Sequence, residues 1–289
     1  MSNADWIAVI FTYLITMTDH NNLIDRTALL RNRTRYEVGR GSFLHDEAIS
    51  EVQHRLTLIN KSFTDIAIVT PQPDLWQTAF PDAMILDDED VLEFGDRHFD
   101  LILHVMALHW SNDPVGQMIQ SLRVLRPDGL FLGCLLGGET LRELRSAFAI
   151  AESTVTGGLS PRVLPMADIR DLGALLQRAG FALPVSDSVK LATNYKTPLH
   201  LMKDLRAMGE SNAQRARQKS FTRRAVFEEM IKLYGEHYSI DEHRVAATFE
   251  IMWLTGWAPS ESQPRPLRPG SAKLRLSEAL RVEEKSLKD

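Results

Sequence analysis

The chain has 289 residues, a formal net charge of −5, 44% hydrophobic residues and 25% charged residues. This composition is ordinary for a folded globular protein, and the net negative charge excludes a general nucleic-acid-binding protein. The single cysteine, Cys134, excludes an internal disulfide and a cysteine zinc cluster. Because a lone cysteine fits a reducing compartment, we predict a cytoplasmic location.

The N-terminal stretch Trp6–Met17 is strongly apolar, but it is shorter than the about 20 residues that a transmembrane helix needs. A signal peptide would carry positive charge before this stretch, where only Asp5 is charged. We predict no stable membrane span, with a membrane anchor as the alternative. Residues 1–22 are interpreted as an extension, either an added strand or helix or, by preference, an error in the translation start.

Two helices are predicted before the first strand. Leu23–Arg35 is basic and compatible with a helix, and its arginines either face solvent or bind an acidic partner. Phe43–Leu58 has apolar residues at helical spacing. Asp65–Thr70 is a short β-branched run, which predicts the first strand.

The turn after this first strand lacks the glycines of a nucleotide-binding βαβ unit. Glycine lets the backbone approach the ligand, but none occurs between Gly41 and Gly95, and two prolines in the turn remove amide donors. Ala83–Leu86 predicts the second strand. Only Asp74–Asp96 separates the first predicted strand from the strand that begins at Phe99, and this short interval indicates that at least one strand–helix unit is missing or abbreviated.

The centre of the chain predicts one complete βαβ unit. Phe99–Leu108 is nearly all apolar, which is typical of a strand buried on both faces of a parallel sheet. Pro114–Leu125 has helical spacing, Pro127–Gly129 predicts a turn, and Leu130–Leu136 predicts the next strand. Further along, Pro198–Tyr238 is predicted to be helical.

The residues from Phe99 to Gly138 resemble the second half of a class I S-adenosylmethionine-dependent methyltransferase domain. The triplet Leu108–Trp110, followed by Asn112 and Asp113, and the turn Arg126–Gly129 carry this match. The chain is similar to the branch that holds the malonyl-carrier-protein O-methyltransferase and the methyltransferase-like assembly factor of mitochondrial complex I, a protein-arginine hydroxylase. A Met-Gly-Glu-Ser-Asn segment at 208–212 is similar to this assembly-factor branch. The resemblance covers about residues 23–272.

This resemblance implies an α/β, Rossmann-like class I methyltransferase fold. The sheet should be mostly parallel with an antiparallel last strand, and it should be abbreviated in its N-terminal half. We expect one methyltransferase-like domain at 23–272 with a helical insertion at about 195–243, followed by a C-terminal tail at 273–289. The implied cofactor is S-adenosylmethionine, although its usual glycine-rich turn is not present in the sequence.

The candidate site residues follow the carboxyl ends of predicted strands, where α/β folds bind ligands. His109 is a candidate base or a hydrogen-bonded structural histidine, and the glycine turn at 137–138 could hold an anion or be a plain tight turn. The candidate cofactor contacts are Thr70, Asp87, Asp88, Met106, Leu108 and Trp110. The candidate substrate or partner contacts are Gly137, Gly138, Thr140, Glu210, Asn212, Ser262, Gln263 and Arg265.

Several of these candidates also have a purely structural interpretation. Asp87 or Asp88 would bind ribose or adenine groups, or both would belong to a solvated acidic loop. Trp110 would stack on a substrate or a sulfonium, or simply pack in the core. No metal site is predicted.

Two functions remain open from the sequence. The first is an S-adenosylmethionine-dependent methyltransferase with an altered cofactor loop and an unknown acceptor. The second is a methyltransferase-fold protein that has lost methyl transfer and helps to assemble a respiratory complex I subunit, with arginine hydroxylation as a further option. Family resemblance favours the first and the missing glycine turn favours the second, since fold alone does not decide function. The expected partner is a protein substrate or a respiratory-complex subunit.

Overall fold

The structure is a computed structural model that describes residues 22–264 and 278. The chain divides into two units, Met1–Pro259 and Ser260–Asp289, and the fold described below is that of the first unit. The predicted N-terminal extension, nearly all of the predicted tail, and Arg265 lie outside the described residues. No helix among the described residues is long and apolar enough to cross a membrane.

Helices and strands alternate along the chain, as the predicted βαβ pattern requires. The first half contains α2 (Arg26–Arg33), α3 (Phe43–Leu58), β1 (Ile66–Val69), α4 (Pro73–Ala79), β2 (Met84–Leu86), β3 (Phe99–Val105), the 3-10 turn η1 (Leu108–Trp110), α5 (Pro114–Val124) and β4 (Leu125–Leu136). The second half contains α6 (Arg142–Thr156), α7 (Ile169–Ala179), β5 (Ala182–Tyr195), α8 (Pro198–Ala207), α9 (Arg224–Tyr238), β6 (Ser239–Asp241) and β7 (Arg244–Trp257).

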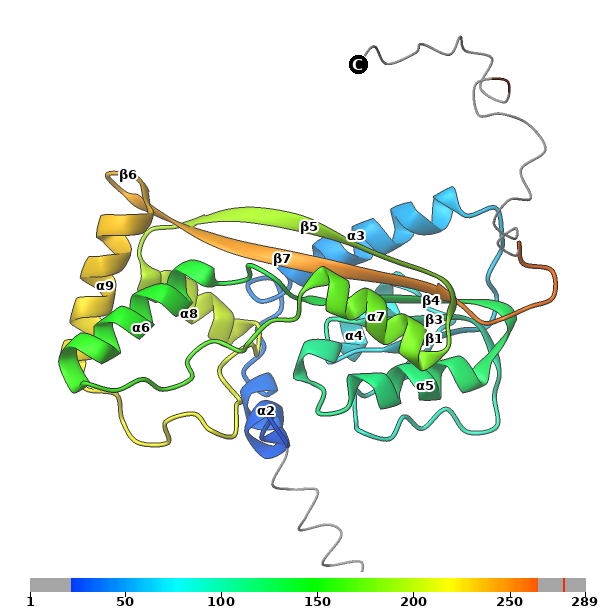
Figure 1. Ribbon diagram of the computed structural model, residues 1–289, viewed down its shortest axis with the longest axis horizontal. Coiled ribbons are helices and arrows are strands. Elements are labelled where there is room, and N and C mark those ends of the chain that lie inside the picture. Colours follow the sequence, from blue (N-terminus) through cyan, green and yellow to red (C-terminus); the bar gives the residue numbers. More distant parts are fainter. Residues whose placement is uncertain (1–21, 265–277, 279–289) are drawn as a thin grey trace, which may run out of the picture. The chain divides into compact units, whose positions relative to one another are not determined.

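The strands form one mixed sheet in the order β2-β1-β3-β4-β7-β5 (Figure 1). The first four are parallel, and β7 runs antiparallel to both β4 and β5. This confirms the predicted mostly parallel sheet with an antiparallel last strand. The chain between β1 and β3 contributes one strand to the sheet, the edge strand β2. No helix lies between β2 and β3 in the sequence. The N-terminal half is therefore abbreviated, as the spacing predicted.

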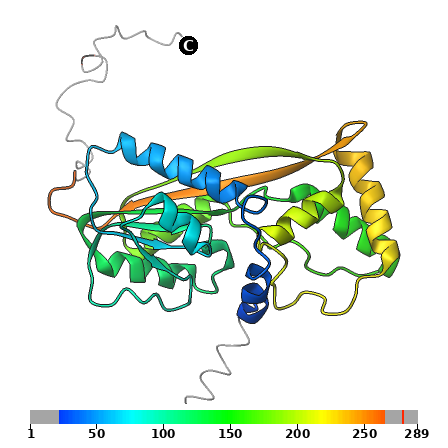
Figure 2. The same cartoon turned by 180° about the vertical axis from the view of Figure 1, so that it is seen from behind.

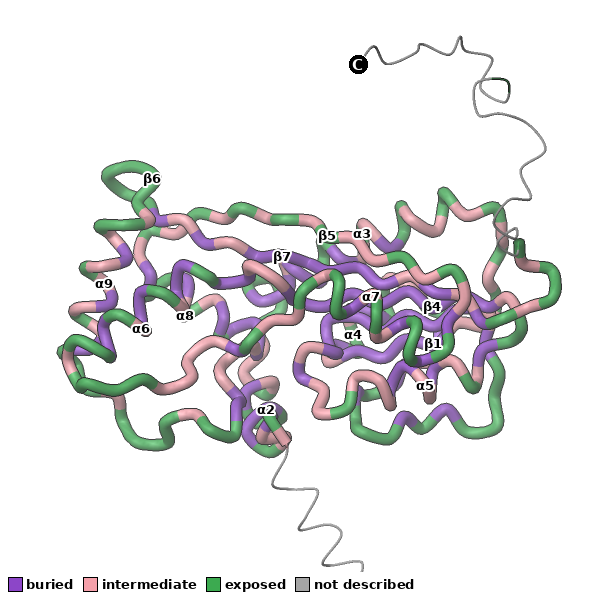
Figure 3. Tube along the Cα trace, in the orientation of Figure 1, coloured by how far each residue is buried: buried purple, intermediate pink, exposed green. Residues whose placement is uncertain are grey.

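The parallel strands are buried on both faces, since α3 and α4 cover one side and α5 and α7 the other. Alternate residues of β3 show this division: Leu101 and Leu103 belong to the first core cluster, and Ile102 belongs to the second. Figure 3 shows these central strands as the most buried part of the trace. The two-sided burial explains why β3 is apolar throughout rather than alternating.

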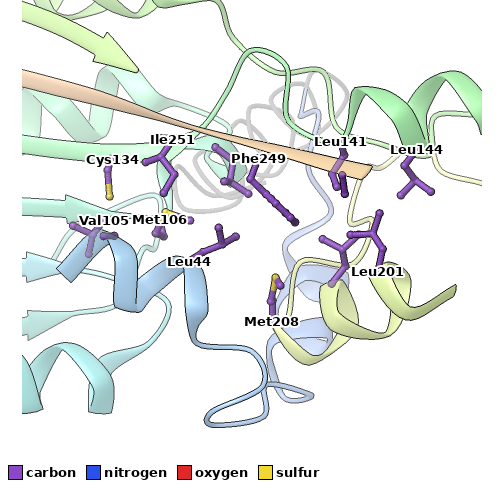
Figure 4. Close-up of a cluster of buried hydrophobic side chains, with 14 of the residues drawn as sticks. Leu44, Val105, Met106, Cys134, Leu141, Leu144, Leu201, Met208, Phe249 and Ile251 are labelled. Atoms are coloured by element: carbon purple, nitrogen blue, oxygen red, sulfur yellow. The ribbon is translucent and has the colours of Figure 1, made fainter. Parts of the chain in front are cut away.

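Strands β5 and β7 form a long ribbon that extends beyond the parallel strands. Each has 14 residues, but β7 pairs with β4 only over Ile251–Trp257, so its first half pairs with β5. Helices α6, α8 and α9 pack against that first half and form a continuous core with it. Figure 4 shows Phe249 projecting from β7 toward Leu201 of α8.

Two local predictions are wrong. The residues Pro127–Gly129, predicted as a turn before a strand at Leu130–Leu136, lie within β4, which begins at Leu125; Asp128 takes a positive φ of 63° there. The region Pro198–Tyr238 is not one helical stretch, because an irregular segment at 208–223 separates α8 from α9. Gly209 begins that segment with a φ of 79°, a conformation that ends a helix at little cost only for glycine.

Candidate functional site

The turn between β1 and α4 is packed into the core rather than open. Thr70 is fully buried, and its Oγ1 accepts a hydrogen bond from the Gln72 amide at 3.2 Å. Trp76 is also fully buried; its Nε1 donates to His45 Nδ1 at 3.0 Å, and its ring stacks on Phe80. Core side chains therefore fill the space beside the carboxyl end of β1, where the resemblance implies a glycine-rich cofactor turn.

The carboxylate of Asp88 is buried, whereas its neighbour Asp87 is exposed. Arg33 donates two hydrogen bonds to it, Nη1 to Oδ1 at 2.5 Å and Nη2 to Oδ2 at 2.8 Å, and Arg26 Nη1 lies 3.4 Å from Oδ2. Burial by itself raises the pKa of Asp88, but the hydrogen bonds and charges of both arginines outweigh it and lower the pKa. The interpretation of this loop as solvated is wrong for Asp88. The prediction that Arg26 and Arg33 face solvent or bind an acidic partner protein is also wrong, because both contact Asp88 of the same chain.

A largely buried carboxylate, that of Glu210 with its side chain 11% exposed, also connects two predicted candidates after β3. Glu210 Oε2 accepts a hydrogen bond from Trp110 Nε1 at 2.6 Å and lies 3.2 Å from His109 Nε2. Burial works against the charged form of Glu210, but His109, Trp110 and the charge of Arg33 together lower its pKa. The structure thus joins Glu210 to two adjacent residues that lie 101 and 100 positions earlier in the sequence.

The candidates Met106 and Leu108 are buried at the carboxyl end of β3. Met106 belongs to the core cluster beneath α3, with a positive φ of 54° at the end of the strand. Leu108 and His109 line a small cavity of about 140 Å³ on the other side of the sheet. His109 therefore lies between this cavity and the Glu210 carboxylate.

The glycine turn before α6 holds an anion that belongs to the protein itself. The Glu139 amide donates to Glu250 Oε2 at 2.8 Å, and Thr140 Oγ1 accepts from the Glu250 amide at 3.0 Å. Gly138 has a φ of 49°, and a Cβ there would lie 2.1 Å from Glu250 Oε2. Gly137, Gly138 and Thr140 therefore form a turn around a buried carboxylate from β7, which fills the predicted anion position.

An apolar cavity of about 210 Å³ opens beside Glu210. Its walls come from η1, α6, α8, α9 and the irregular segments between them. The lining includes Trp110, Leu144, Phe148, Met202, Phe227 and Glu210. Glu210 Oε1 accepts no hydrogen bond from any residue that the structure describes, because its hydrogen-bond contacts are both at Oε2. A carboxylate oxygen therefore remains for a ligand in this cavity.

The remaining candidates divide between the two units. Asn212 lines the same cavity, and its Nδ2 donates to the Pro161 carbonyl at 2.7 Å. Ser262 and Gln263 belong to the second unit, where each contacts Ser260. The structure brings together Trp110, Glu210 and Asn212 and leaves the Ser262 segment as a prediction.

Sequence reasoning missed the buried partners that close the site. Arg33, Arg26, His45 and Glu250 were not candidates, because nothing in a sequence pairs an arginine of one helix with an aspartate 55 residues away. The one available signal was the basic character of Leu23–Arg35 together with the acidic run after β2. These opposite charges were interpreted separately.

Two buried histidines predict how stability depends on pH. Burial lowers the pKa of His45 and of His104 to about 4, from an ordinary value of 6.5. Between these values the unfolded chain binds protons that the folded chain does not, so stability falls as the pH falls from 6.5 to 4. We expect a loss of about 1.4 kcal/mol per pH unit for each histidine, measured by urea unfolding at several pH values.

A substitution separates this effect from general acid sensitivity. His45→Gln should remove about half of the slope, and His243→Gln, at an exposed position, should leave it unchanged. An equal slope in wild type and His45→Gln would contradict the assignment.

Comparison with known proteins yields a family and several relatives. A family model described as a methyltransferase domain matches residues 36–133. The Danio rerio protein named "Arginine-hydroxylase NDUFAF5, mitochondrial" is 38% identical over 202 residues, which cover 70% of this chain and 63% of that protein. The Laribacter hongkongensis "Malonyl-[acyl-carrier protein] O-methyltransferase" is 31% identical, covering 65% of this chain and 61% of that protein. The Rickettsia prowazekii "Putative methyltransferase RP459" is 31% identical, covering 56% of this chain and 70% of that protein.

These relatives are longer than the matched region, and one of them corrects the predicted location. The chain spans about three fifths of the length of the Danio rerio and Laribacter hongkongensis relatives. The predicted cytoplasmic location is contradicted, because the Danio rerio relative is named as mitochondrial. A single cysteine indicates only a reducing compartment, and it does not distinguish one such compartment from another.

The residues at the carboxyl ends of β1 and β2 do not fit the cofactor that the resemblance implies. The carboxylate that would accept ribose hydroxyls, Asp88, is already hydrogen-bonded to Arg33 and paired with Arg26. Trp76 fills the core beside the turn, and two prolines stand where the backbone would approach the ligand. A bound S-adenosylmethionine would have to displace these side chains.

Proposed function

Because this chain belongs to the class I methyltransferase family, whose sheet it keeps, we propose that it binds a cationic side chain of a protein partner in the cavity beside Glu210. The observation that carries this proposal is a buried carboxylate, with one oxygen accepting no hydrogen bond, at the wall of an apolar cavity of about 210 Å³. A cation on a long apolar stem matches both features, since its stem packs on the walls and its head meets the charge.

Of the charged side chains that line the cavity, the carboxylate of Glu210 is better placed to bind a ligand than the guanidinium of Arg162, which favours a cationic ligand. Arg162 also lines it, but that guanidinium is paired with Glu152, with Nε 2.8 Å from Oε1, and donates to Thr222 Oγ1. Its charge is therefore compensated within the protein. Glu210, by contrast, offers an ionised oxygen in a water-poor site, where an opposite charge interacts strongly.

The relatives support arginine as the cation and a respiratory-chain protein as the partner. The Danio rerio relative is named an arginine-hydroxylase, and a guanidinium carries several N–H donors, any one of which could reach the available Glu210 oxygen. The resemblance to the complex I assembly factor supports a complex I subunit as the source of the arginine. For this chain we propose binding of that arginine, with the shape of the cavity selecting the segment around it.

The test is a binding measurement with peptides from complex I subunits. Arginine-containing peptides that bind the purified chain are resynthesised with citrulline, which keeps the shape of arginine and removes its charge. We expect citrulline to abolish binding, and Glu210→Gln to weaken binding of the arginine peptide by about 30-fold or more, since loss of one partner of a buried ion pair costs about 2–5 kcal/mol.

A matched control keeps this test specific. Glu236→Gln makes the same change at an exposed position of α9 and should leave the affinity unchanged. Equal affinity for arginine and citrulline peptides, or no effect of Glu210→Gln, would count against the proposal.

A second candidate function is methyl transfer to the bound side chain. The match of residues 36–133 to a methyltransferase domain favours it. Mass spectrometry of the peptide after incubation with S-adenosylmethionine tests it, and an added methyl group would establish it. The unaltered peptide would leave binding alone as the function of the cavity.

A further inference from the structure

Helix α2 connects the place after β2 with the segment that carries Glu210. Arg33, in its last turn, binds Asp88 with both guanidinium nitrogens, at 2.5 and 2.8 Å. The side chains of Arg33 and Asp88 are only 11% and 4% exposed, so this pair is shielded from water. Such a bidentate contact is more directional than a surface ion pair.

The other side of α2 is tied to the irregular segment 208–223. Asn32 Nδ2 donates to the Ser211 carbonyl at 2.9 Å, and the Asp25 amide, at the start of the helix, donates to the Ala213 carbonyl at 2.8 Å. Gly209 allows the backbones to approach, because a Cβ there would lie 3.1 Å from Arg33 Cα. Figures 1 and 2 both place α2 between the parallel strands and the α6, α8 and α9 helices.

The charge of Arg33 influences several ionisable groups around α2. It helps to lower the pKa of Asp88, which follows β2, of Glu210, which follows α8, and of His45 in α3. A nearby cation stabilises the ionised form of a buried carboxylate.

We infer that α2 fills the place where the methyltransferase cofactor would bind. Arg33 binds the Asp88 carboxylate to which the cofactor ribose would hydrogen-bond, and α2 thereby positions the segment that carries Glu210. In a cofactor-dependent domain the bound ligand would order this region. Here the ordering comes from the helix, so the cavity beside Glu210 is formed without a small molecule. Exclusion of the cofactor by α2 does not depend on which ligand the cavity beside Glu210 binds.

The experiment combines two measurements on the full chain. Calorimetric titration with S-adenosylmethionine and S-adenosylhomocysteine, at concentrations up to about 1 mM, should give no binding to the wild type. Amide hydrogen exchange followed by mass spectrometry should show residues 209–215 protected in wild type and exchanging at least about 10-fold faster in Arg33→Ala. Arg31→Ala changes an exposed arginine of the same helix and should leave this exchange unchanged.

The outcomes separate clearly. Binding of either nucleoside to wild type with a dissociation constant below about 100 µM would overturn the inference, as would equal protection of 209–215 in Arg33→Ala. Binding by Arg33→Ala but not by wild type would support it, because α2 would then be what excludes the cofactor. If Arg33→Ala does not fold, Arg33→Lys serves instead: it keeps the charge, loses the bidentate geometry, and should show intermediate exchange.

Discussion

Replacing Asp88 with alanine is expected to lower the free energy of unfolding by about 3–5 kcal/mol. The substitution leaves Arg33 and Arg26 without their shared carboxylate, at side-chain exposures of only 11% and 17%. A cation that loses its partner in such a site bears a desolvation cost without compensation. Urea unfolding followed by circular dichroism at neutral pH measures the loss.

The neighbouring carboxylate provides the control. Asp87→Ala changes an exposed side chain and should alter stability by no more than about 0.5 kcal/mol. The lowered pKa of Asp88 sets the pH dependence: its contribution is present above its unfolded value and is lost as the pH falls through its folded value. The stability gap between wild type and Asp88→Asn should therefore narrow below a pH of about 4. A gap that stays constant would contradict this assignment.

Replacing Trp76 with alanine is expected to cost about 3–5 kcal/mol of unfolding free energy. Trp76 has no exposed surface, stacks on Phe80 and donates to His45, so its removal leaves both a cavity and a buried nitrogen without its donor. The same urea experiment measures the loss. A value below about 1 kcal/mol would mean that the indole is not part of the core and that the space after β1 is available to a ligand.

A conservative variant separates the contribution of the indole hydrogen bond from that of aromatic packing. Trp76→Phe keeps an aromatic ring and removes the indole N–H, so we expect it to cost about 1–2 kcal/mol from the lost hydrogen bond. Thr78→Ala, two residues later in the same helix and exposed, should be nearly neutral.

The cavity beside Glu210 and the turn after β1 are built differently in this chain. The cavity has a charged group, Glu210, in its wall and is lined mainly from η1, α6, α8, α9 and the irregular segments between them. The turn after β1 has no glycine and is packed, and the buried aspartate after β2 binds arginines of α2. Different elements therefore form the cavity and this turn.

Several features of the protein could be derived from the sequence alone. The apolar run of β3 and the helical spacing of α5 predicted a buried βαβ unit, because a strand covered on both faces has no polar side. The absence of glycine between Gly41 and Gly95 predicted the altered turn, since backbone approach to a ligand depends on local residue type. Such features are encoded in neighbouring residues.

Only the tertiary structure decided the roles of the charged residues. Asp88 belongs to an acidic run and Arg33 to a basic one, and each run alone is compatible with a solvated surface. Their pairing depends on how α2 packs against the end of β2, across 55 positions of sequence. The contact of Glu210 with His109 spans 101 positions in the same way. Local sequence determines which elements form, but the sum of their packing contacts determines which buried charges meet.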